Sequence, residues 1–368
     1  MKILHLLDSV NRGGAETQVL DICRNAARHG LEMTLVAAGG GVMEEEFRDS
    51  GVEYVRLERK LPVDLFLASQ LRKIIRERGI EIVHGYQAVD GLHLYLATRR
   101  LRSVKRVLSF QGFIPGTKNR MVARAIAARM HANISVSRSL MTYLRDEAGI
   151  RRFDNFHVIY NGADPARLQP SGGSVRAELR IPNDARVGAM VANFTADPTK
   201  DQLTICRALP QVIARFPNFH FLFAGRVSPG AEGRMADCIG VCLENGITDN
   251  VHFLGGRSDV PDILSELDVF VFSSRQEGFP VAVSEAMLAR VPMIVSDIEA
   301  LREAVNDGEC GEMFPVGDVA ALTGKIVDLL SDEARRRDLA RVARAYAEDN
   351  FCIDAHLREL ERLYASLI

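Results

Sequence analysis

Short apolar runs alternate with amphipathic stretches along almost the whole chain, and this alternation limits the possible folds more than any other feature. Residues 16–29 and 65–78 repeat apolar side chains at the spacing of one helix face. Buried strands that alternate with amphipathic helices are typical of parallel sheets covered on both faces, so the pattern predicts an α/β fold. In the first half, the strand-like runs are residues 3–7, 33–38, 52–57, 80–84, 104–110, 134–136 and 156–159.

The alternation starts again after a turn-rich stretch at 160–173, which is the best candidate for a linker. The 368 residues are enough for two domains with separate cores. We therefore expect one domain over 1–170, a second over 171–350, and a helix over 351–368 that packs back towards the first domain. In the second half, the strand-like runs are 186–193, 220–224, 251–254, 269–272 and 293–295, and helices are predicted at 202–215, 318–331, 333–349 and 353–367.

The formal net charge of -2 conceals an asymmetry between the two halves. Residues 1–170 carry 26 basic and 18 acidic side chains, whereas residues 171–368 carry 20 and 30. Between Arg99 and Arg152 there are 13 basic side chains and two acidic ones. Such a stretch indicates either an anionic partner (phosphate, nucleic acid or an anionic membrane) or a solvated basic face.

Several classes of protein are disfavoured by what the sequence does not contain. No apolar run approaches the roughly 18 residues of a membrane span, and the N-terminus is too briefly apolar for a signal peptide, so we expect a cytoplasmic protein. The six cysteines are scattered without a C-x-x-C pair, which predicts buried free thiols and no metal site. No dinucleotide fingerprint is present, and we expect no cofactor.

The first glycine-rich turn, residues 11–16, lies between the first predicted strand and the first predicted helix. Gly13 and Gly14 would let the backbone approach a ligand, and the start of the helix would offer unpaired N–H groups to an anion. The spacing fits neither a dinucleotide fingerprint nor a phosphate-binding Walker loop. An ordinary tight turn remains the alternative interpretation.

A second turn follows the predicted strand at 269–272 and contains two carboxylates. Glu277 stands at the carboxyl end of that strand, Gly278 and Pro280 shape the turn, and a helix begins near Val281. The N–H groups at the start of that helix suit a phosphate. Glu285 lies one turn into the helix, so both carboxylates could accept hydrogen bonds from the hydroxyls of a sugar and a ribose. Solvated surface glutamates are the alternative.

A third turn, residues 193–201, again connects a strand pattern to a helix pattern. Its Lys200 could reach a phosphate at the same edge of the sheet. The alternative is an exposed lysine near a helix start.

These residues resemble a known family. Glu-Gly-Phe-Pro at 277–280, Glu-Ala-Met at 285–287 and Pro292 resemble the E-x7-E motif of the retaining glycosyltransferases of family 4. Gly-Gly-Ala-Glu at 13–16 resembles the glycine loop of that family. The resemblance covers nearly the whole chain and is most specific over 268–303. It implies the GT-B fold, in which two Rossmann-like, doubly wound parallel-sheet domains face a central cleft.

The resemblance also implies a role for each matching position. Glu285 would bind the ribose of a nucleotide sugar, Glu277 would hold hydroxyls of the donor sugar, and Lys200 would neutralise the diphosphate as it leaves. We expect Glu277 and Lys200 to be the catalytic residues. The other donor-binding positions that it implies are Gly14, Asn193, Gly278, Phe279, Pro280, Val281 and Ala282, of which Val281 and Ala282 would present N–H groups to the diphosphate.

Two departures from the family pattern concern charge and proton transfer. Asn193 stands where the family carries a phosphate-binding arginine, so Arg226 or Arg257 would have to supply that charge. Gln111 stands where many members have histidine, and an amide can position a hydroxyl but cannot act as a base. We expect Gln111 and Gly13 to position the acceptor or the sugar.

The implied reaction is metal-independent transfer, with retention, from a nucleotide-diphosphate sugar to a lipid-linked or polysaccharide acceptor in bacterial envelope glycan synthesis. A UDP-sugar is the expected donor and a GDP-sugar its main rival. The basic stretch resembles an amphipathic helix and predicts peripheral binding to the inner face of the plasma membrane. Its membrane-facing candidates are Lys118, Arg120, Arg124 and Arg129.

Two alternatives belong to other classes. A sugar-nucleotide 2-epimerase shares the two-domain architecture, although its acid and base residues are not evident. A non-catalytic protein that binds membranes or nucleic acid would explain the basic stretch. The acidic second half argues against nucleic acid, and we expect no such partner.

Overall fold

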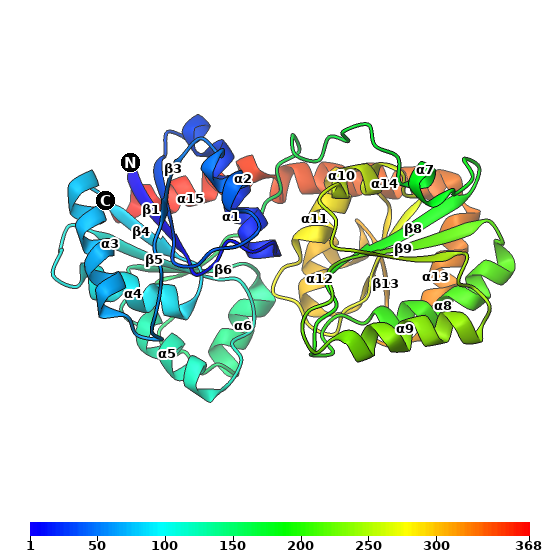
Figure 1. Ribbon diagram of the computed structural model, residues 1–368, viewed down its shortest axis with the longest axis horizontal. Helices are drawn as coiled ribbons and strands as arrows, with labels where there is room; N and C mark the ends of the chain where they lie inside the picture. The colour runs from blue at the N-terminus through cyan, green and yellow to red at the C-terminus, as the bar shows by residue number, and fades with distance from the viewer. The chain divides into compact units, whose positions relative to one another are not determined.

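The computed structural model describes residues 1–368 and divides into two compact units (Figure 1). Unit 1 consists of residues 1–163 and 353–368, and unit 2 consists of residues 164–352. The last helix of the chain therefore belongs to unit 1, together with the N-terminal residues.

Unit 1 is built on a seven-stranded parallel sheet with the strand order β3-β2-β1-β4-β5-β6-β7. The strands are β1 (Lys2–Leu7), β2 (Glu32–Ala37), β3 (Glu53–Arg56), β4 (Ile82–Gly85), β5 (Lys105–Phe110), β6 (Ala132–Ser135) and β7 (Phe156–Val158). The helices are α1 (Gly14–Asn25), η1 (Ala26–His29), α2 (Glu44–Arg48), α3 (Leu65–Arg78), α4 (Ala88–Thr98), α5 (Thr117–Ala127), α6 (Arg138–Asp146) and α15 (Ile353–Leu367).

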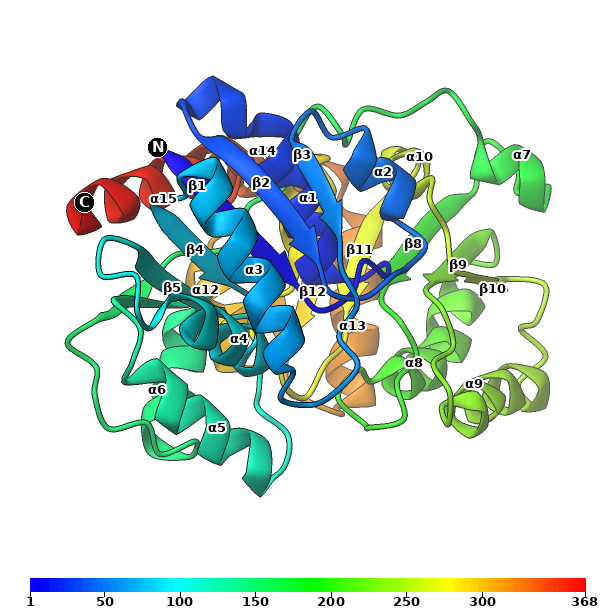
Figure 2. The same cartoon turned by 60° about the vertical axis from the view of Figure 1, so that its left-hand side comes forward.

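The two faces of this sheet bury alternate residues of each strand, as the pleat of a strand requires. Ile3 and Leu7 of β1 pack in one cluster with residues of α1 and α15, whereas Leu4 and Leu6 pack in a second cluster with residues of α3 and α4. Figure 2 shows this sheet from a second direction, with α15 in red near β1. Helices cover both faces, which explains why the strands read as continuous apolar runs.

Unit 2 has a six-stranded parallel sheet with the strand order β10-β9-β8-β11-β12-β13. The strands are β8 (Arg186–Val191), β9 (Phe219–Ala224), β10 (Val251–Gly255), β11 (Val269–Phe272), β12 (Met293–Ser296) and β13 (Glu312–Phe314). The helices are α7 (Val175–Leu179), α8 (Gln202–Arg215), α9 (Glu232–Glu244), α10 (Val260–Ser265), α11 (Val281–Leu288), α12 (Glu299–Ala304), η2 (Asn306–Gly308), α13 (Val319–Ser331) and α14 (Glu333–Asn350).

Both sheets are doubly wound, which confirms the predicted α/β class. The chain order reverses between β1 and β4 in unit 1 and between β8 and β11 in unit 2. Open α/β sheets bind ligands beyond the carboxyl ends of the strands at such a switch point. The loops after β8 and β11 in unit 2, and after β1 in unit 1, are therefore the places to look for function.

Candidate functional site

The loop after β8 reaches across the switch point of unit 2 and pairs with the loop after β11. The Arg275 N–H donates to the Thr199 carbonyl at 2.8 Å, and the Asp201 N–H donates to the Ser273 carbonyl at 3.0 Å. This short antiparallel pairing places Lys200 opposite Ser274. Two candidates that lie 77 residues apart in the sequence, Lys200 and Glu277, are thereby brought together.

Lys200 and Glu277 form an ion pair that is largely removed from water. Their side chains are only 20 % and 8 % exposed, and the Lys200 ammonium lies 5.0 Å from the centre of the Phe272 ring. The Ser274 hydroxyl lies 2.5 Å from the same carboxylate of Glu277 and 2.9 Å from the Thr199 carbonyl. Sheltered charges need such partners, and in this pair each charge holds the other in place.

The turn at 278–280 leads into the start of α11. Gly278, Phe279 and Pro280 are buried, and Pro280 takes an extended conformation as the residue before the helix. No side chain caps this helix start. Val281 and Ala282 occupy the first turn, where the N–H groups of a helix lack partners within the helix and suit an anion.

Glu285 lies in the middle of α11, nearly buried, and forms an ion pair with Arg167. The guanidinium of Arg167 donates to Glu285 Oε1 at 2.7 Å. Arg167 comes from the turn that opens unit 2, where its N–H donates to the Asp164 carbonyl. Sequence reasoning missed Arg167, because nothing in the local pattern indicates a partner 118 residues away.

The two arginines that could supply the phosphate-binding charge, Arg226 and Arg257, differ in their contacts. Arg257 forms ion pairs with Glu178 and Asp259, and these hydrogen bonds raise its pKa. Arg226 forms no ion pair and lies in the loop two residues after β9, where its N–H donates to Asn193 Oδ1 at 2.9 Å. Asn193 therefore holds the loop that carries Arg226. Of the two arginines, Arg226 is the one that remains available to a ligand.

In unit 1, the loop after β1 forms a close backbone contact with the glycine loop after β2. A Cβ atom on Gly39 would lie 2.4 Å from the Asp8 carbonyl oxygen, so only glycine fits. Gly13 precedes α1 without a capping side chain, and Gly14 is the first residue of the helix. Burial raises the pKa of the neighbouring Glu16.

Gln111 follows β5 and contacts a residue from the end of β7. Its Oε1 accepts a hydrogen bond from Asn161 Nδ2 at 3.1 Å. Asn161 is buried, and its own Oδ1 has no hydrogen-bond partner. The two amides therefore leave polar atoms at the carboxyl edge of the sheet that a hydroxyl could satisfy.

His84 is an interior residue with a partner on each ring nitrogen. Its Nδ1 lies 2.6 Å from Tyr364 Oη and its Nε2 lies 2.7 Å from Ser109 Oγ, all buried. His5 lies 2.7 Å from Tyr86 Oη in the same network. Burial lowers the pKa of His5 to about 3 and that of His84 well below its usual range, so both are neutral at pH 7.

The side chains of the basic stretch make several different contacts. Arg106 and Arg129 both lie over the Tyr95 ring, and Arg120 lies over Tyr143. Lys118 is exposed on α5. A separate pocket of about 600 Å³ is lined by Arg124, Arg145, Arg151 and Arg152, together with Ala128, Gly149 and Ile150.

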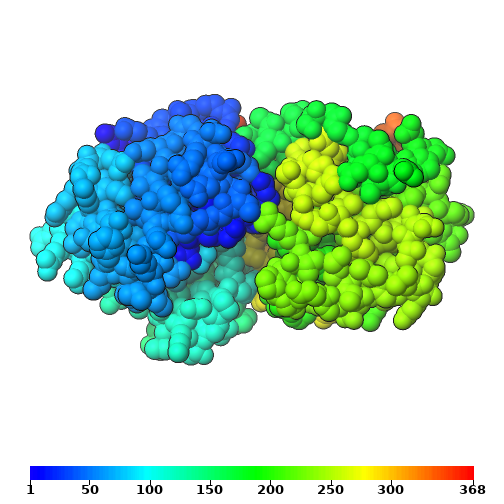
Figure 3. All heavy atoms as spheres, in the orientation of Figure 1, coloured from blue at the N-terminus to red at the C-terminus, as the bar shows by residue number.

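Exposed apolar side chains gather elsewhere in unit 1. The apolar face of α5 is buried through Ala123, Ile126 and Ala127, although Met121 is 61 % exposed. The segment before α3 and its first turn expose four large side chains, at 52–69 % exposure: Leu61, Val63, Leu65 and Phe66. This part of the chain is blue in Figure 3 and forms part of the visible face of unit 1.

None of the helices combines the length and the apolar character needed to cross a lipid bilayer. No group of three or more His, Cys, Asp or Glu side chains is arranged to hold a metal ion. The six cysteines are all buried as free thiols.

Two family models match the chain and divide it in the same way as the sheets. Residues 12–167 match the model described as glycosyltransferase family 4. Residues 185–332 match the model described as glycosyl transferases group 1. The first match includes the glycine turn and Gln111, and the second includes Lys200, Glu277 and Glu285.

Related proteins point the same way. The lipopolysaccharide core biosynthesis mannosyltransferase LpsB of Rhizobium meliloti is 24 % identical over 295 residues, which is 79 % of this chain and 81 % of LpsB. The N,N'-diacetylbacillosaminyl-diphospho-undecaprenol alpha-1,3-N-acetylgalactosaminyltransferase of Campylobacter jejuni is 36 % identical over 116 residues, 31 % of each chain.

The structure of Anabaena HepE in complex with UDP and glucose covers 100 % of both chains, with a TM-score of 0.87 and 22 % identity. At 22 % identity this likeness shows only that the two proteins share a fold. The shared fold is consistent with the two doubly wound sheets described above. Together with the two family models and the relatives, it leads to one conclusion: the chain is a glycosyltransferase of family 4 with the GT-B fold.

Proposed function

We propose that this glycosyltransferase moves a sugar, with retention of anomeric configuration and without a metal ion, from a UDP-sugar to a lipid-linked or polysaccharide acceptor. The observation that carries the proposal is the sheltered Lys200–Glu277 pair beside the uncapped start of α11. UDP is favoured over GDP because HepE was crystallised with UDP and glucose. A glycan or lipid-linked acceptor is favoured because LpsB and the Campylobacter enzyme are named for such products.

In the proposed mechanism, unit 2 binds the donor at the carboxyl ends of β8 and β11. The N–H groups of Val281 and Ala282 and the ammonium of Lys200 contact the diphosphate, while Arg226 supplies a second positive charge. Negative charge grows on the diphosphate as the sugar–phosphate bond breaks. N–H groups and cationic side chains that are already in position before the reaction stabilise this negative charge more in the transition state than in the ground state.

Glu277 and Glu285 would bind the two sugars of the donor. Glu277, with the backbone at 278–280, accepts hydrogen bonds from the transferred sugar, and Glu285 accepts them from the ribose. When a diphosphate approaches Lys200, the ammonium can contact a phosphate oxygen while it remains beside Glu277. The pair therefore couples recognition of the sugar to neutralisation of the leaving group.

The acceptor hydroxyl would attack from the face that the leaving group vacates, and the departing phosphate takes its proton. In this scheme no side chain needs to act as a nucleophile. Gln111 positions a hydroxyl through its amide, because an amide cannot remove a proton at neutral pH. Gly13 and Gly14 allow a close approach of the backbone to the substrates.

We further propose that unit 1 binds the inner face of the plasma membrane peripherally. The exposed apolar segment 61–66 would enter the lipid interface, and Met121 would add to it. Lys118, Arg120, Arg124 and Arg129 would contact anionic headgroups. The sequence suggested that α5 itself would lie on the membrane, but most of its apolar face is buried within unit 1. Segment 61–66 therefore takes over the apolar contact in this proposal.

The deciding experiment incubates the protein with a panel of UDP- and GDP-sugars and an undecaprenyl-diphosphate-linked sugar acceptor, without added metal. We expect release of UDP and a glycosylated lipid whose anomeric configuration matches that of the donor, as read by NMR. Formation of an isomerised sugar nucleotide would instead support the epimerase. Failure of Leu61→Ser/Phe66→Ser to reduce binding to anionic vesicles would contradict the membrane proposal alone.

A further inference from the structure

A second pocket of unit 2 lies at the opposite edge of the sheet from Lys200 and Glu277. It has a volume of about 670 Å³. Arg186, the first residue of β8, lines it, as does Pro292, which directly precedes β12. The strands therefore run from this pocket towards the candidate donor site. Its six arginines are Arg186, Arg290, Arg336, Arg337, Arg341 and Arg344.

The charge at this pocket is opposite to that of the surrounding sequence. Residues 171–368 carry 20 basic and 30 acidic side chains, yet the pocket is lined by six arginines and three carboxylates. The carboxylates are Asp268, Glu333 and Glu348, which form ion pairs with Arg186, Arg337 and Arg344. Arg341 pairs with Asp338, which does not line the pocket, so Arg290 and Arg336 are the two arginines without an ion pair. A concave surface with excess positive charge attracts anions.

Arg336 is the buried charge of the pocket. Only 5 % of the residue is exposed, and it forms no ion pair with a carboxylate. Its Nη1 donates to the carbonyls of Leu329 and Leu330, at 2.8 and 2.7 Å, where α13 ends. Burial and the nearby Arg186 lower its pKa, although the carboxylates of Asp268, Glu333 and Asp332 act in the opposite direction.

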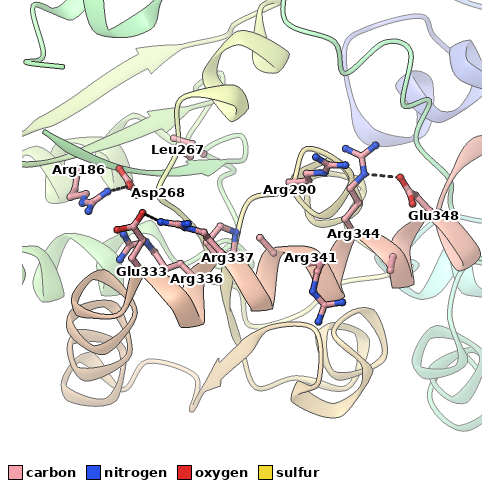
Figure 4. Close-up of a pocket in the computed structure, with 13 residues that line it drawn as sticks. Arg186, Leu267, Asp268, Arg290, Glu333, Arg336, Arg337, Arg341, Arg344 and Glu348 are labelled. Carbon is pink, nitrogen blue, oxygen red and sulfur yellow. Dashed lines mark hydrogen bonds and ion pairs between the residues drawn. The ribbon is translucent and has the colours of Figure 1, made fainter. Parts of the chain in front are cut away.

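Arg290 places a charge in the pocket from a strained backbone position. Its φ of 62° lies in the left-handed region, which is unfavourable for a residue with a side chain. It forms no ion pair, and Figure 4 draws it beside Arg344. Arg344 in turn donates to the Leu288 carbonyl at 3.1 Å, at the end of α11. Glycine would suit this backbone position better, so the arginine here carries a local conformational cost.

We propose that this pocket binds a soluble polyphosphate-type anion, a chain of several phosphate groups. Arg336 and Arg344 are eight residues apart on α14, which corresponds to about 12 Å along the helix axis. That length exceeds a single phosphate and suits a chain of them. One guanidinium can donate two parallel hydrogen bonds to the oxygens of a phosphate, and these bonds are more directional than those of an ammonium.

The test is calorimetric titration of the full chain with inorganic triphosphate at low salt. The protein carries Lys200→Ala, so that the candidate donor site does not contribute and the stoichiometry reports the pocket. We expect one triphosphate per chain, and Arg337→Gln to weaken its affinity about tenfold, as the loss of a charge-assisted contact implies. Arg335→Gln is the matched control, because Arg335 lies on the same helix but pairs with Glu312 outside the pocket.

Arg290→Gly separates binding from folding. The substitution relieves the positive φ, so the free energy of unfolding should stay the same or rise, while affinity for triphosphate falls about tenfold. The proposal is overturned if triphosphate binds no better than sulfate, or if Arg335→Gln weakens binding as much as Arg337→Gln. It is also overturned, in favour of a lipid phosphate, if Arg290→Gly/Arg337→Gln loses binding to phosphatidylglycerol vesicles while triphosphate does not bind.

Discussion

At the residue scale, the molecule combines charges that are distant in sequence into sheltered pairs. Lys200 meets Glu277 at the carboxyl edge of the sheet in unit 2, and Arg167 meets Glu285 in α11, the helix that begins near that edge. Lys200, Glu277 and Glu285 could each be singled out from a local motif, whereas Arg167 could not. The pairing itself depends on backbone contacts between separate loops, which no local pattern contains.

Lys200→Ala should reduce kcat for sugar transfer about 100-fold, because the leaving diphosphate loses a fixed positive charge. Lys200→Arg should retain part of the activity, since the charge persists with a different shape. Steady-state release of UDP measures both. The melting temperature serves as the control for folding, because Glu277 loses its cationic partner. An alanine variant with unchanged kcat would remove Lys200 from the mechanism.

Arg167→Ala should weaken binding of UDP through Glu285, even though Arg167 has no assigned contact with the nucleotide. We expect Glu285→Gln and Arg167→Ala to be non-additive, with a coupling energy of about 1–3 kcal/mol, as for residues in direct contact. Titration of UDP into the four proteins of this cycle gives the coupling. Strictly additive losses would mean that the ion pair does not position Glu285.

At the element scale, the tight strand-to-helix loops of unit 2 depend on glycine at one close approach. A Cβ atom on Gly225 would lie 2.0 Å from the Ala192 carbonyl oxygen, where the loop of Arg226 after β9 meets the loop of Asn193 after β8. Gly225→Ala should therefore lower the free energy of unfolding by more than 2 kcal/mol, since backbone must move. Gly240→Ala is the control: nothing lies within 4 Å of its Cβ, so in the middle of α9 it should stabilise by about 0.5–1 kcal/mol. Urea unfolding measures both.

Elements with a clear apolar run could be predicted from the sequence, and strand β13, which lacks one, could not. The run at 269–272 is a strand because four consecutive apolar residues need cover on both faces. The run at 3–7 has the same pattern except for His5, which is itself buried. Strand β13 spans only Glu312–Phe314, between Gly311 and Pro315, and is too short to produce a pattern. The strand expected at 134–136 is Ala132–Ser135, because the buried Asn133 interrupts its apolar run.

The same distinction applies to the candidate site. Glu277, Glu285 and the glycine turn carry local motifs that residue spacing can reveal. The engagement of Arg257 with Glu178, 79 residues away, and the burial of the apolar face of α5 are tertiary facts. These contacts decide which basic side chains remain available to a ligand or a membrane. Composition alone could not indicate such contacts.

At the scale of the whole molecule, the two units differ in how they bury histidine. Unit 1 contains His5, His84 and His356 in its interior, where burial lowers the pKa of His5 and His84 and charge on His356 lowers it further. The pKa of His356 is itself lowered to about 4 by burial. The two histidines of unit 2, His220 and His252, are only half-buried. Acid should therefore act on the units unequally.

The sign follows from proton binding. An unfolded histidine takes up its proton near pH 6.5, whereas His5 and His356 in the folded unit remain neutral down to about pH 3–4. Between these values the unfolded state binds more protons, so the stability of unit 1 falls as the pH falls, by about 1.4 kcal/mol per pH unit for each such histidine. Hydrogen exchange by mass spectrometry, corrected for intrinsic rates, should show peptides of 1–163 and 353–368 losing protection between pH 6.5 and 4.5 before those of 164–352.

Replacing His5 with Gln should flatten this dependence by about one proton, even if that variant is less stable at pH 7. Equal loss of protection in both units would show that the buried network does not govern the acid response.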